Sequence, residues 1–260
     1  MKPSVLHCLT IFLLCFVSRI SYAEIKQSIN SQCSVYINSI SAVKTPSQLV
    51  LPKHGWQSVQ LPDNWAKHWQ NYSGSAWYKI QWKLLCQENT RLAEPIAFAV
   101  DYINSAGAIF LNGDLLWQDQ NLQEPLSKSW NMPRYWLLPA SGLRSDQNEI
   151  LIYVNGFAFQ SAGLGEISFN NVQKNYQLHQ TKIWNSRTLF EINIILSITF
   201  GIICFVIWLL RPKETTFGWF ALSSLLWVLF ISNVLITETW PYSSSLMATQ
   251  ANLVFLFCIS

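Results

Sequence analysis

The stretch INIILSITFGIICFVIWLL, at Ile192–Leu210, decides the fold, because it is uncharged and long enough to cross a lipid bilayer as a helix. A second uncharged stretch, FGWFALSSLLWVLFISNVLI at Phe217–Ile236, follows after only six residues. The hydrocarbon core of a bilayer is spanned by about 20 helical residues. We therefore expect two transmembrane helices, over residues 189–210 and 217–236, joined by a tight loop.

Composition favours a membrane protein and argues against nucleic acid as a partner. Charged residues make up 12% of the chain, against roughly 25% in soluble proteins. The net charge is only +3, and the lysines and arginines are scattered along the chain. A nucleic-acid surface would need them clustered. We expect the lipid bilayer, and no nucleic acid, among the partners.

The first 23 residues have the pattern of a secretory signal peptide. Met1-Lys2 is a positive start and Val5–Val17 is an apolar core. Ser21-Tyr22-Ala23 then places small residues at the −3 and −1 positions of a cleavage site after Ala23. The alternative is an uncleaved anchor helix. Export would place residues 24–188 outside, so the first span runs inward and the second returns.

The cysteines divide according to these segments. Two of the six leave with the signal peptide, and Cys204 and Cys258 lie in apolar runs. Only Cys33 and Cys86 remain in the exported part, and a pair of cysteines in an oxidising compartment favours a disulfide. We expect Cys33 and Cys86 to be bonded; the alternative is two buried free thiols.

Residues 24–172 alternate as the strands of a β-sandwich do. In Ala76–Leu84 the side chains of Tyr78, Ile80, Trp82 and Leu84 share one face, which is the period of a half-buried strand. Ile96–Tyr102 repeats the pattern, and Ile150–Val154 is apolar on both faces, as expected of a central strand. Asn112-Gly113 between two apolar runs predicts a β-hairpin. The pattern predicts an all-β sandwich.

Several motifs occur in the order seen in galactose-binding-like jelly rolls, the domains that accompany relatives of β-galactosidase and β-glucuronidase. They are Trp56–Trp65 (WQSVQLPDNW), Gly74–Tyr78 (GSAWY), Phe110–Gly113 (FLNG) and Asn148–Val154 (NEILIYV). With the membrane runs and Thr239-Trp240-Pro241, the chain resembles the bacterial seven-transmembrane receptors with diverse intracellular signalling modules. The resemblance covers residues 50–260. It implies a periplasmic jelly roll, an inner-membrane helical bundle, and an output such as a histidine kinase or a diguanylate cyclase.

The membrane half raises three further expectations. A third apolar run, 245–260, is too short to span, so we expect a fragment of a longer membrane protein. The linker at 173–188 either extends the first membrane helix outward or is a passive tether. Asn193 and Asn233 are polar side chains near the outer ends of the two spans. They either face each other or a shared water, or each bonds to its own helix or reaches the headgroups.

The exported part contains no catalytic or metal-binding pattern, and we expect no cofactor and no metal. Asp63 and Asp101 could be imagined as a glycosidase pair. The alternative is that Asp63 shapes a turn and that Asp101 lies on a solvated strand face. The resemblance itself departs from its family at the end of the sequence, where no output module follows.

Nine tryptophans between residues 24 and 188 raise the question of ligand stacking. Rings in or beside predicted loops are candidates for binding a small molecule or a carbohydrate: Trp65, Trp69, Tyr72, Trp117, Trp130 and Tyr135. The alternative for each is packing, since tryptophan is also the largest core residue. We expect a receptor that senses a ligand or partner outside the membrane, with a homodimer as a further candidate. The alternative function is a membrane-tethered carbohydrate-binding or assembly module without signalling.

Overall fold

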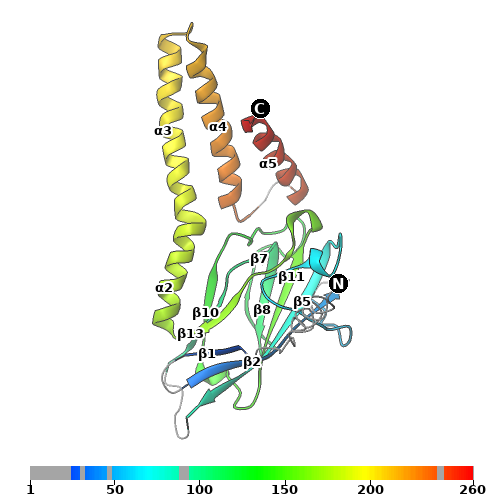
Figure 1. Cartoon of the computed structure of the whole chain (residues 1–260). Coiled ribbons are helices and arrows are strands. Elements are labelled where there is room, and N and C mark those ends of the chain that lie inside the picture. The colour runs from blue at the N-terminus through cyan, green and yellow to red at the C-terminus, as the bar shows by residue number, and fades with distance from the viewer. Residues whose placement is uncertain (1–24, 30–32, 46–48, 88–93, 239–242, 260) are drawn as a thin grey trace, which may run out of the picture.

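The computed structural model describes residues 25–259, apart from 30–32, 46–48, 88–93 and 239–242. The expected signal peptide, 1–23, and Thr239-Trp240-Pro241 lie outside the described residues. Within them, a β-domain is followed by helices that leave it at one end (Figure 1). A β-rich domain followed by apolar helices, as the sequence predicts, is confirmed.

All strand pairs in the β-domain are antiparallel. The largest sheet has the order β1-β2-β5-β11-β8-β9, with β3 beside β2. Its strands are β1 (Ile25–Ser28), β2 (Cys33–Thr45), β3 (Gln57–Ser58), β5 (Gly74–Cys86), β8 (Ala106–Leu111), β9 (Asp114–Gln118) and β11 (Asn148–Gly156). The second sheet has the order β10-β6-β13, with bounds Arg134–Leu138, Ile96–Val100 and Ile167–Asn170. A small third sheet joins β4 (Asp63–Asn64), β12 (Gly163–Leu164) and β7 (Ile103–Asn104).

The two larger sheets share one hydrophobic core, which makes the domain a sandwich. Tyr78, Ile80 and Trp82 of β5 are fully buried in it, as the alternation in Ala76–Leu84 predicts. Trp82 meets Phe169 of β13 across the core, with ring centroids 4.8 Å apart. Burial of such large aromatic rings is the main favourable contribution to the stability of the domain.

The outer face of the largest sheet is also covered, because the segment 49–56 folds over it. Trp77 belongs to that outer face by its position in β5, yet it is only 3% exposed. Its indole N–H donates to the carbonyl oxygen of Val50 at 3.0 Å, and its ring lies 5.3 Å from that of Tyr153. β11 is therefore buried on both sides, in agreement with the apolar run Ile150–Val154.

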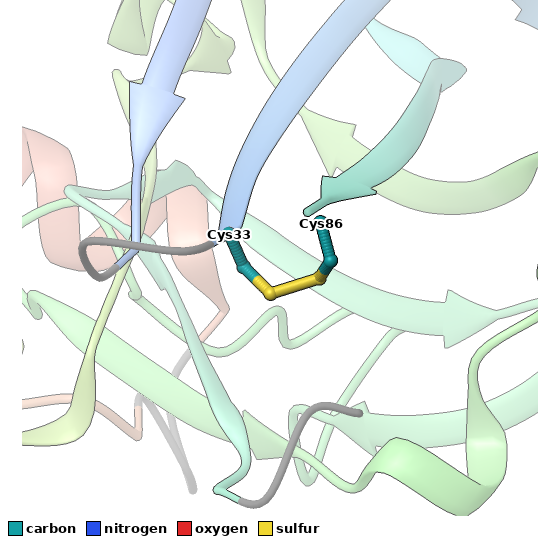
Figure 2. Close-up of a disulfide and its surroundings, with 2 residues drawn as sticks. All are labelled: Cys33 and Cys86. Atoms are coloured by element: carbon teal, nitrogen blue, oxygen red, sulfur yellow. A yellow bond between two sulfur atoms is a disulfide. The ribbon is translucent and has the colours of Figure 1, made fainter. Parts of the chain in front are cut away.

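A disulfide joins Cys33 and Cys86 (Figure 2). The two residues are direct partners at the end of the β2–β5 ladder. The bond therefore ties the first long strand of the domain to a strand in the middle of the largest sheet.

The sandwich has two ends, and only one faces the helices. The hairpin turn at Asn112-Gly113 joins β8 to β9, with both residues at positive φ (52° and 100°), as an Asn-Gly turn requires. It marks the distal end. The opposite ends of these two strands, Gly107 and Gln118, adjoin the loop that contacts the helices. We call this the junction end.

The helical half begins with one unbroken helical segment. α2 (Val172–Ile183) passes through a π-helical turn (Trp184–Thr188) into α3 (Leu189–Leu210), and α4 (Thr215–Leu235) returns beside it. The segments Val172–Leu210 and Thr215–Leu235 are long and apolar enough to cross a membrane. α5 (Ser244–Ile259) follows and packs on α4 (Figure 1). The linker 173–188 is thus helical, the first of its two expected forms.

α3 and α4 approach closely where their side chains are small. A Cβ added at Gly201 would lie 3.1 Å from the Cβ of Ser224. Small residues of this kind let membrane helices pack at short range. Beside this contact runs an apolar groove of about 660 Å³ between the two helices, with Trp208 and Trp219 among its lining residues.

Candidate functional site at the junction of the sandwich and the helices

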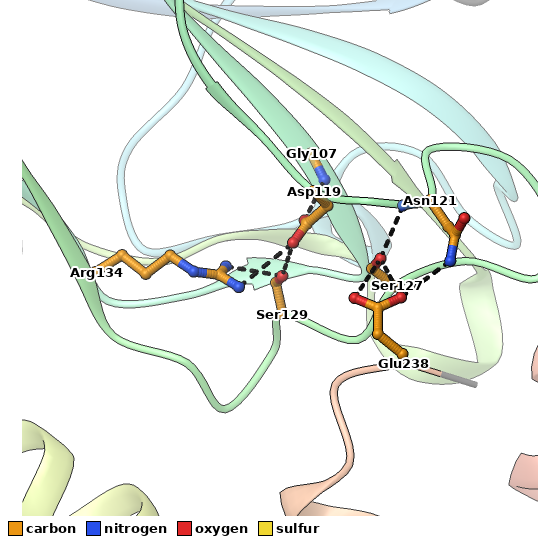
Figure 3. Close-up of polar contacts among 7 residues, drawn as sticks. All are labelled: Gly107, Asp119, Asn121, Ser127, Ser129, Arg134 and Glu238. Atoms are coloured by element: carbon orange, nitrogen blue, oxygen red, sulfur yellow. Dashed lines mark hydrogen bonds and ion pairs between the residues drawn. The ribbon is translucent and has the colours of Figure 1, made fainter. Parts of the chain in front are cut away.

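The loop between β9 and β10, residues 119–133, carries most of the hydrogen bonds to the helices, and we call it the docking loop. Its base is held by the buried carboxylate of Asp119 (Figure 3). The backbone N–H of Gly107 donates to Asp119 Oδ2 at 2.8 Å, and the Ser129 hydroxyl donates to Oδ1 at 2.6 Å. Arg134 lies 3.4 Å from the same Oδ1. Both ends of the docking loop are thereby fixed to β8.

The base of the docking loop is shielded from water. Burial raises the pKa of Asp119, while the hydrogen bond from Ser129 and the charge of Arg134 act in the opposite direction. Burial also lowers the pKa of the Arg134 guanidinium, which lies 4.3 Å over the ring of Trp117. An ion pair in such surroundings holds a fixed geometry, because breaking it leaves a buried charge alone.

Two cations bind the carboxyl end of α4. Lys128 Nζ donates to the carbonyl oxygen of Asn233 at 2.9 Å and also to its side-chain oxygen. Arg187 Nη2 donates to the carbonyl oxygen of Leu235 at 2.8 Å. The last carbonyls of a helix lack partners within the helix and carry the negative end of its dipole, so cations are favoured there. Burial lowers the pKa of Lys128 to about 8.

The connection from α4 to α5 is held by the same loop. The carboxylate of Glu238 accepts hydrogen bonds from the Asn121 amide at 3.0 Å and from the Ser127 hydroxyl at 2.8 and 2.9 Å (Figure 3). At the start of α5, the backbone N–H of Ser244 donates to Glu124 Oε1 at 2.6 Å. A carboxylate at this end of a helix is favoured by the helix dipole.

The first helical segment is held separately, against the second sheet. Lys182 of α2 forms an ion pair with Asp101, at the end of β6. The His179 ring meets the edge of the Tyr135 ring at 4.9 Å, and burial together with the charge of Lys182 lowers the pKa of His179. From the docking loop, the Asn131 amide donates to the carbonyl oxygen of Ser186 in the π-helical turn at 2.6 Å.

These contacts join the docking loop to the helices at several separate points. The docking loop contacts the π-helical turn before α3, the end of α4 and the start of α5. Any displacement of the loop would therefore reach three helices. In the described part of the chain, no group of three or more His, Cys, Asp or Glu side chains could hold a metal ion.

Two of the rings predicted to bind ligand are core residues. Trp65 is 2% exposed and Trp69 is 5% exposed. The Trp65 indole N–H donates to the Tyr78 hydroxyl at 2.9 Å. The prediction of ligand contact is wrong for Trp65 and Trp69, because both rings are enclosed by the core. Tyr72 packs beside them, half-buried, and donates its hydroxyl to the carbonyl oxygen of Ser75 at 2.6 Å.

The other three predicted rings flank the docking loop. Trp117 lies under the Arg134 guanidinium, and Tyr135 packs on His179 of α2. Trp130, in the loop itself, is 40% exposed. The six rings thus form two separate groups, and Trp130 is the one with a large exposed face.

Asp63 and Asp101 have separate structural roles. Asp63 is buried and accepts a hydrogen bond from the Tyr78 hydroxyl at 2.5 Å, and burial beside this carboxylate raises the pKa of Tyr78. Asp101 pairs with Lys182. The two carboxylates belong to different contact networks, which does not fit a glycosidase pair. Their roles also differ from the expected alternative, because Asp63 is buried in β4 and Asp101 pairs with α2 instead of lying on a solvated strand face.

The two membrane asparagines bind different partners. Asn193 accepts a hydrogen bond from the Trp227 indole N–H of α4 at 2.8 Å. Asn233 accepts from Lys128, and its amide donates to the carbonyl oxygen of Met247 in α5 at 3.3 Å. The prediction of direct contact between Asn193 and Asn233 is therefore wrong, and so is that of bonding of each side chain to its own helix, because each one bonds to another element.

The residues that make the junction were not predicted from the sequence, although one signal was present. Glu238 is the only charged residue from Phe217 to Ser260. A single carboxylate between two apolar helices needs partners, and the sandwich supplies them through Asn121 and Ser127. Asp119 and Lys128 gave no comparable signal, because charged residues in loops are usually solvated.

No protein-family model matches the chain, and no curated protein matches it. Among solved structures it is similar to a β-glucuronidase from Ruminococcus gnavus in complex with C6-substituted uronic isofagomine, at 13% identity and a TM-score of 0.38. It is also similar to a putative β-galactosidase from Bacteroides fragilis, at 13% identity and a TM-score of 0.41. These matches cover 51% and 53% of this chain and 23% of each enzyme. No activity follows for this chain from so partial a likeness.

Proposed function

We propose that this chain is the sensory part of a membrane-bound bacterial signal-transduction protein. The sandwich, as a galactose-binding-like jelly roll in the periplasm, senses a small molecule, a carbohydrate or a protein partner. The inner-membrane helices relay its state to a cytoplasmic output, a histidine kinase or a diguanylate cyclase.

The observation that carries this proposal is the unbroken helical segment Val172–Leu210. Its first third packs on the second sheet of the sandwich through Lys182 and His179. Its last 22 residues, α3, form the first apolar span. A helix transmits displacement along its axis because its backbone hydrogen bonds join successive turns of the same helix. A ligand that favours one position of the second sheet over another would shift α3 with it.

The proposal is tested by breaking the helix register at the junction. Inserting two glycines between Lys182 and Ile183 of the natural full-length protein should abolish the response of its output while leaving ligand binding intact. The matched control is the same insertion between Asn112 and Gly113, in the turn at the distal end, which should leave the response unchanged.

The outcomes separate the receptor from its alternative. A response that survives the insertion in α2 would remove the role of the helix. A protein that binds carbohydrate but has no output that follows binding would instead be the tethered binding module.

A further inference from the structure

The turn after β11, residues 157–161, presents an exposed aromatic ring at the junction end of the sandwich, and we call it the aromatic tip. Its sequence is FAFQS. Phe159 is 59% exposed, and its ring stacks on that of Phe157 with centroids 5.2 Å apart. Large apolar side chains grouped on an exposed turn commonly mark a contact surface.

The backbone of the aromatic tip is held in place, so the exposure of Phe159 is built into the fold. The backbone N–H of Ala158 donates to the Ser73 hydroxyl at 3.0 Å. The Asn104 amide donates to the carbonyl oxygen of Ser161 at 3.1 Å, and the Ser105 hydroxyl donates to Gln160 Oε1 at 2.5 Å. A turn anchored on both sides cannot readily fold its aromatic side chain back into the core.

Hydrogen bonds connect the tip to the outer end of α4. Ser105, which binds Gln160 of the tip, accepts a hydrogen bond at its carbonyl oxygen from the N–H of Ser129 at 2.7 Å. The residue before Ser129, Lys128, donates its backbone N–H to the carbonyl oxygen of Thr237 at 2.6 Å. In Figure 1 the yellow-green turn after β11 reaches the level at which α4 ends and α5 begins.

That level is the outer surface of the bilayer if α3 and α4 span it, as the proposed function requires. Two exposed tryptophans lie at the same junction. Trp130, in the docking loop, is 40% exposed, and Trp184 is 51% exposed in the π-helical turn, which Asn131 of that loop contacts. Aromatic rings concentrate at the membrane–water interface, where an apolar body and a polar edge are both accommodated.

We propose that the aromatic tip inserts Phe159 into the outer face of the bilayer, at the boundary between headgroups and acyl chains. The sandwich then rests on the membrane at two places, on the helices through the docking loop and on lipid through the tip. The lipid contact fixes the tilt of the sandwich and so the position of its second sheet over α3.

The inference is tested in lipid nanodiscs with an environment-sensitive fluorophore at a single cysteine. The full chain carries Phe159→Cys for labelling at the tip, and the four cysteines outside the disulfide are removed by Cys8→Ala, Cys15→Ala, Cys204→Ala and Cys258→Ala. The matched control is Leu115→Cys, because Leu115 is similarly exposed, at 52%, but follows the distal hairpin. Nitroxide placed high on the lipid acyl chain should reduce emission at position 159 about threefold and leave position 115 unchanged, for a ring buried by about 5–10 Å.

A second labelling site keeps the inference falsifiable if position 159 tolerates no change. Ala158→Cys should show the same quenching with Phe159 intact and lose it with Phe159→Glu. Equal access of aqueous iodide to positions 159 and 115 would overturn the inference. Protection from both iodide and lipid nitroxide would overturn it as well, since a second copy of the chain would then cover the tip.

The natural Cys204 separates this inference from the proposed function on which it rests. In nanodiscs made with the Cys8→Ala/Cys15→Ala/Cys258→Ala variant, Cys204 in α3 should resist a water-soluble maleimide. If Cys204 resists labelling while the tip is exposed to water, only the proposed lipid contact is contradicted. Rapid labelling of Cys204 would contradict the membrane span of α3, and with it both proposals.

Discussion

Removing the disulfide should lower the stability of the sandwich by a large and calculable amount. Cys33 and Cys86 are 53 residues apart in sequence, and their bond restricts the unfolded chain over that whole loop. In the chain-entropy model a loop of this length corresponds to about 4 kcal/mol. The double variant Cys33→Ala/Cys86→Ala removes the bond without leaving a single thiol behind.

The assay is urea unfolding of the full chain in nanodiscs, followed by tryptophan fluorescence. With a urea dependence of about 2 kcal/mol per molar, the unfolding midpoint should fall by about 2 M. Reduction of the unaltered protein should give the same shift. Cys204→Ala is the control, because Cys204 is a free cysteine in α3.

The reasoning is refuted if the midpoint of the double variant stays within about 0.3 M of the parent, since a 4 kcal/mol loss cannot be hidden in that interval. If the unfolding midpoint of the Cys204→Ala control fell as far as that of the double variant, the loss of stability would come from removing cysteines and not from breaking the disulfide.

Three further perturbations follow from particular contacts. Asp119→Ala should cost about 3–5 kcal/mol in the same urea assay, because it leaves a half-buried arginine and two buried donors without their acceptor; a loss below about 1 kcal/mol would contradict the role of Asp119. The pKa of Lys128 is about 8 when the docking loop is bound to the end of α4, against 10.5 when the side chain is hydrated. Binding of the loop to α4 should therefore become stronger as the pH rises from about 8 to 10.5. The equilibrium constant for docking should rise by at most about tenfold per pH unit. This rise should appear in pH-corrected amide exchange of residues 120–128 and be absent in Lys128→Met. Gly163→Ala should destabilise by at least about 3 kcal/mol, because its Cβ would lie 2.1 Å from the carbonyl oxygen of Asp63. Gly142→Ala, whose nearest contact is 3.7 Å, should be neutral in the same measurement.

Patterns with a strong local cause could be predicted from the sequence. The alternation in Ala76–Leu84 places Tyr78, Ile80 and Trp82 in the core, because side chains of a strand point to opposite faces. The apolar runs around Ile192–Leu210 and Phe217–Ile236 correspond to α3 and α4 within two or three residues. Each of these signals depends on neighbours along the chain.

The features that the sequence did not reveal depend on contacts between distant segments. Trp65 and Trp69 follow a polar turn, so they suggested a binding surface. Their burial is decided by packing on Tyr78 and Tyr72, which come from β5 and the loop before it. The sequence suggested that Asn233 contacts Asn193, because the two lie at similar positions in their helices. In the structure Asn233 instead binds Lys128, which is 105 residues away in sequence. Pairings at such separation leave no periodic trace in one sequence.

The two connections between the sandwich and the helices differ in kind, and on the proposed function this difference decides what the helices relay. α2 continues into α3 through backbone bonds, so on the proposed function a shift of the second sheet would reach α3. α4 and α5 are joined to the sandwich by side-chain hydrogen bonds from Lys128, Glu124 and the partners of Glu238. Hydrogen bonds to charged groups contribute only about 1.5–3 kcal/mol each, so this second connection can be released reversibly. A stimulus that loosens the docking loop would therefore move α3 relative to α4. Relative movement of neighbouring helices is the form in which a membrane bundle passes a change of state across the bilayer.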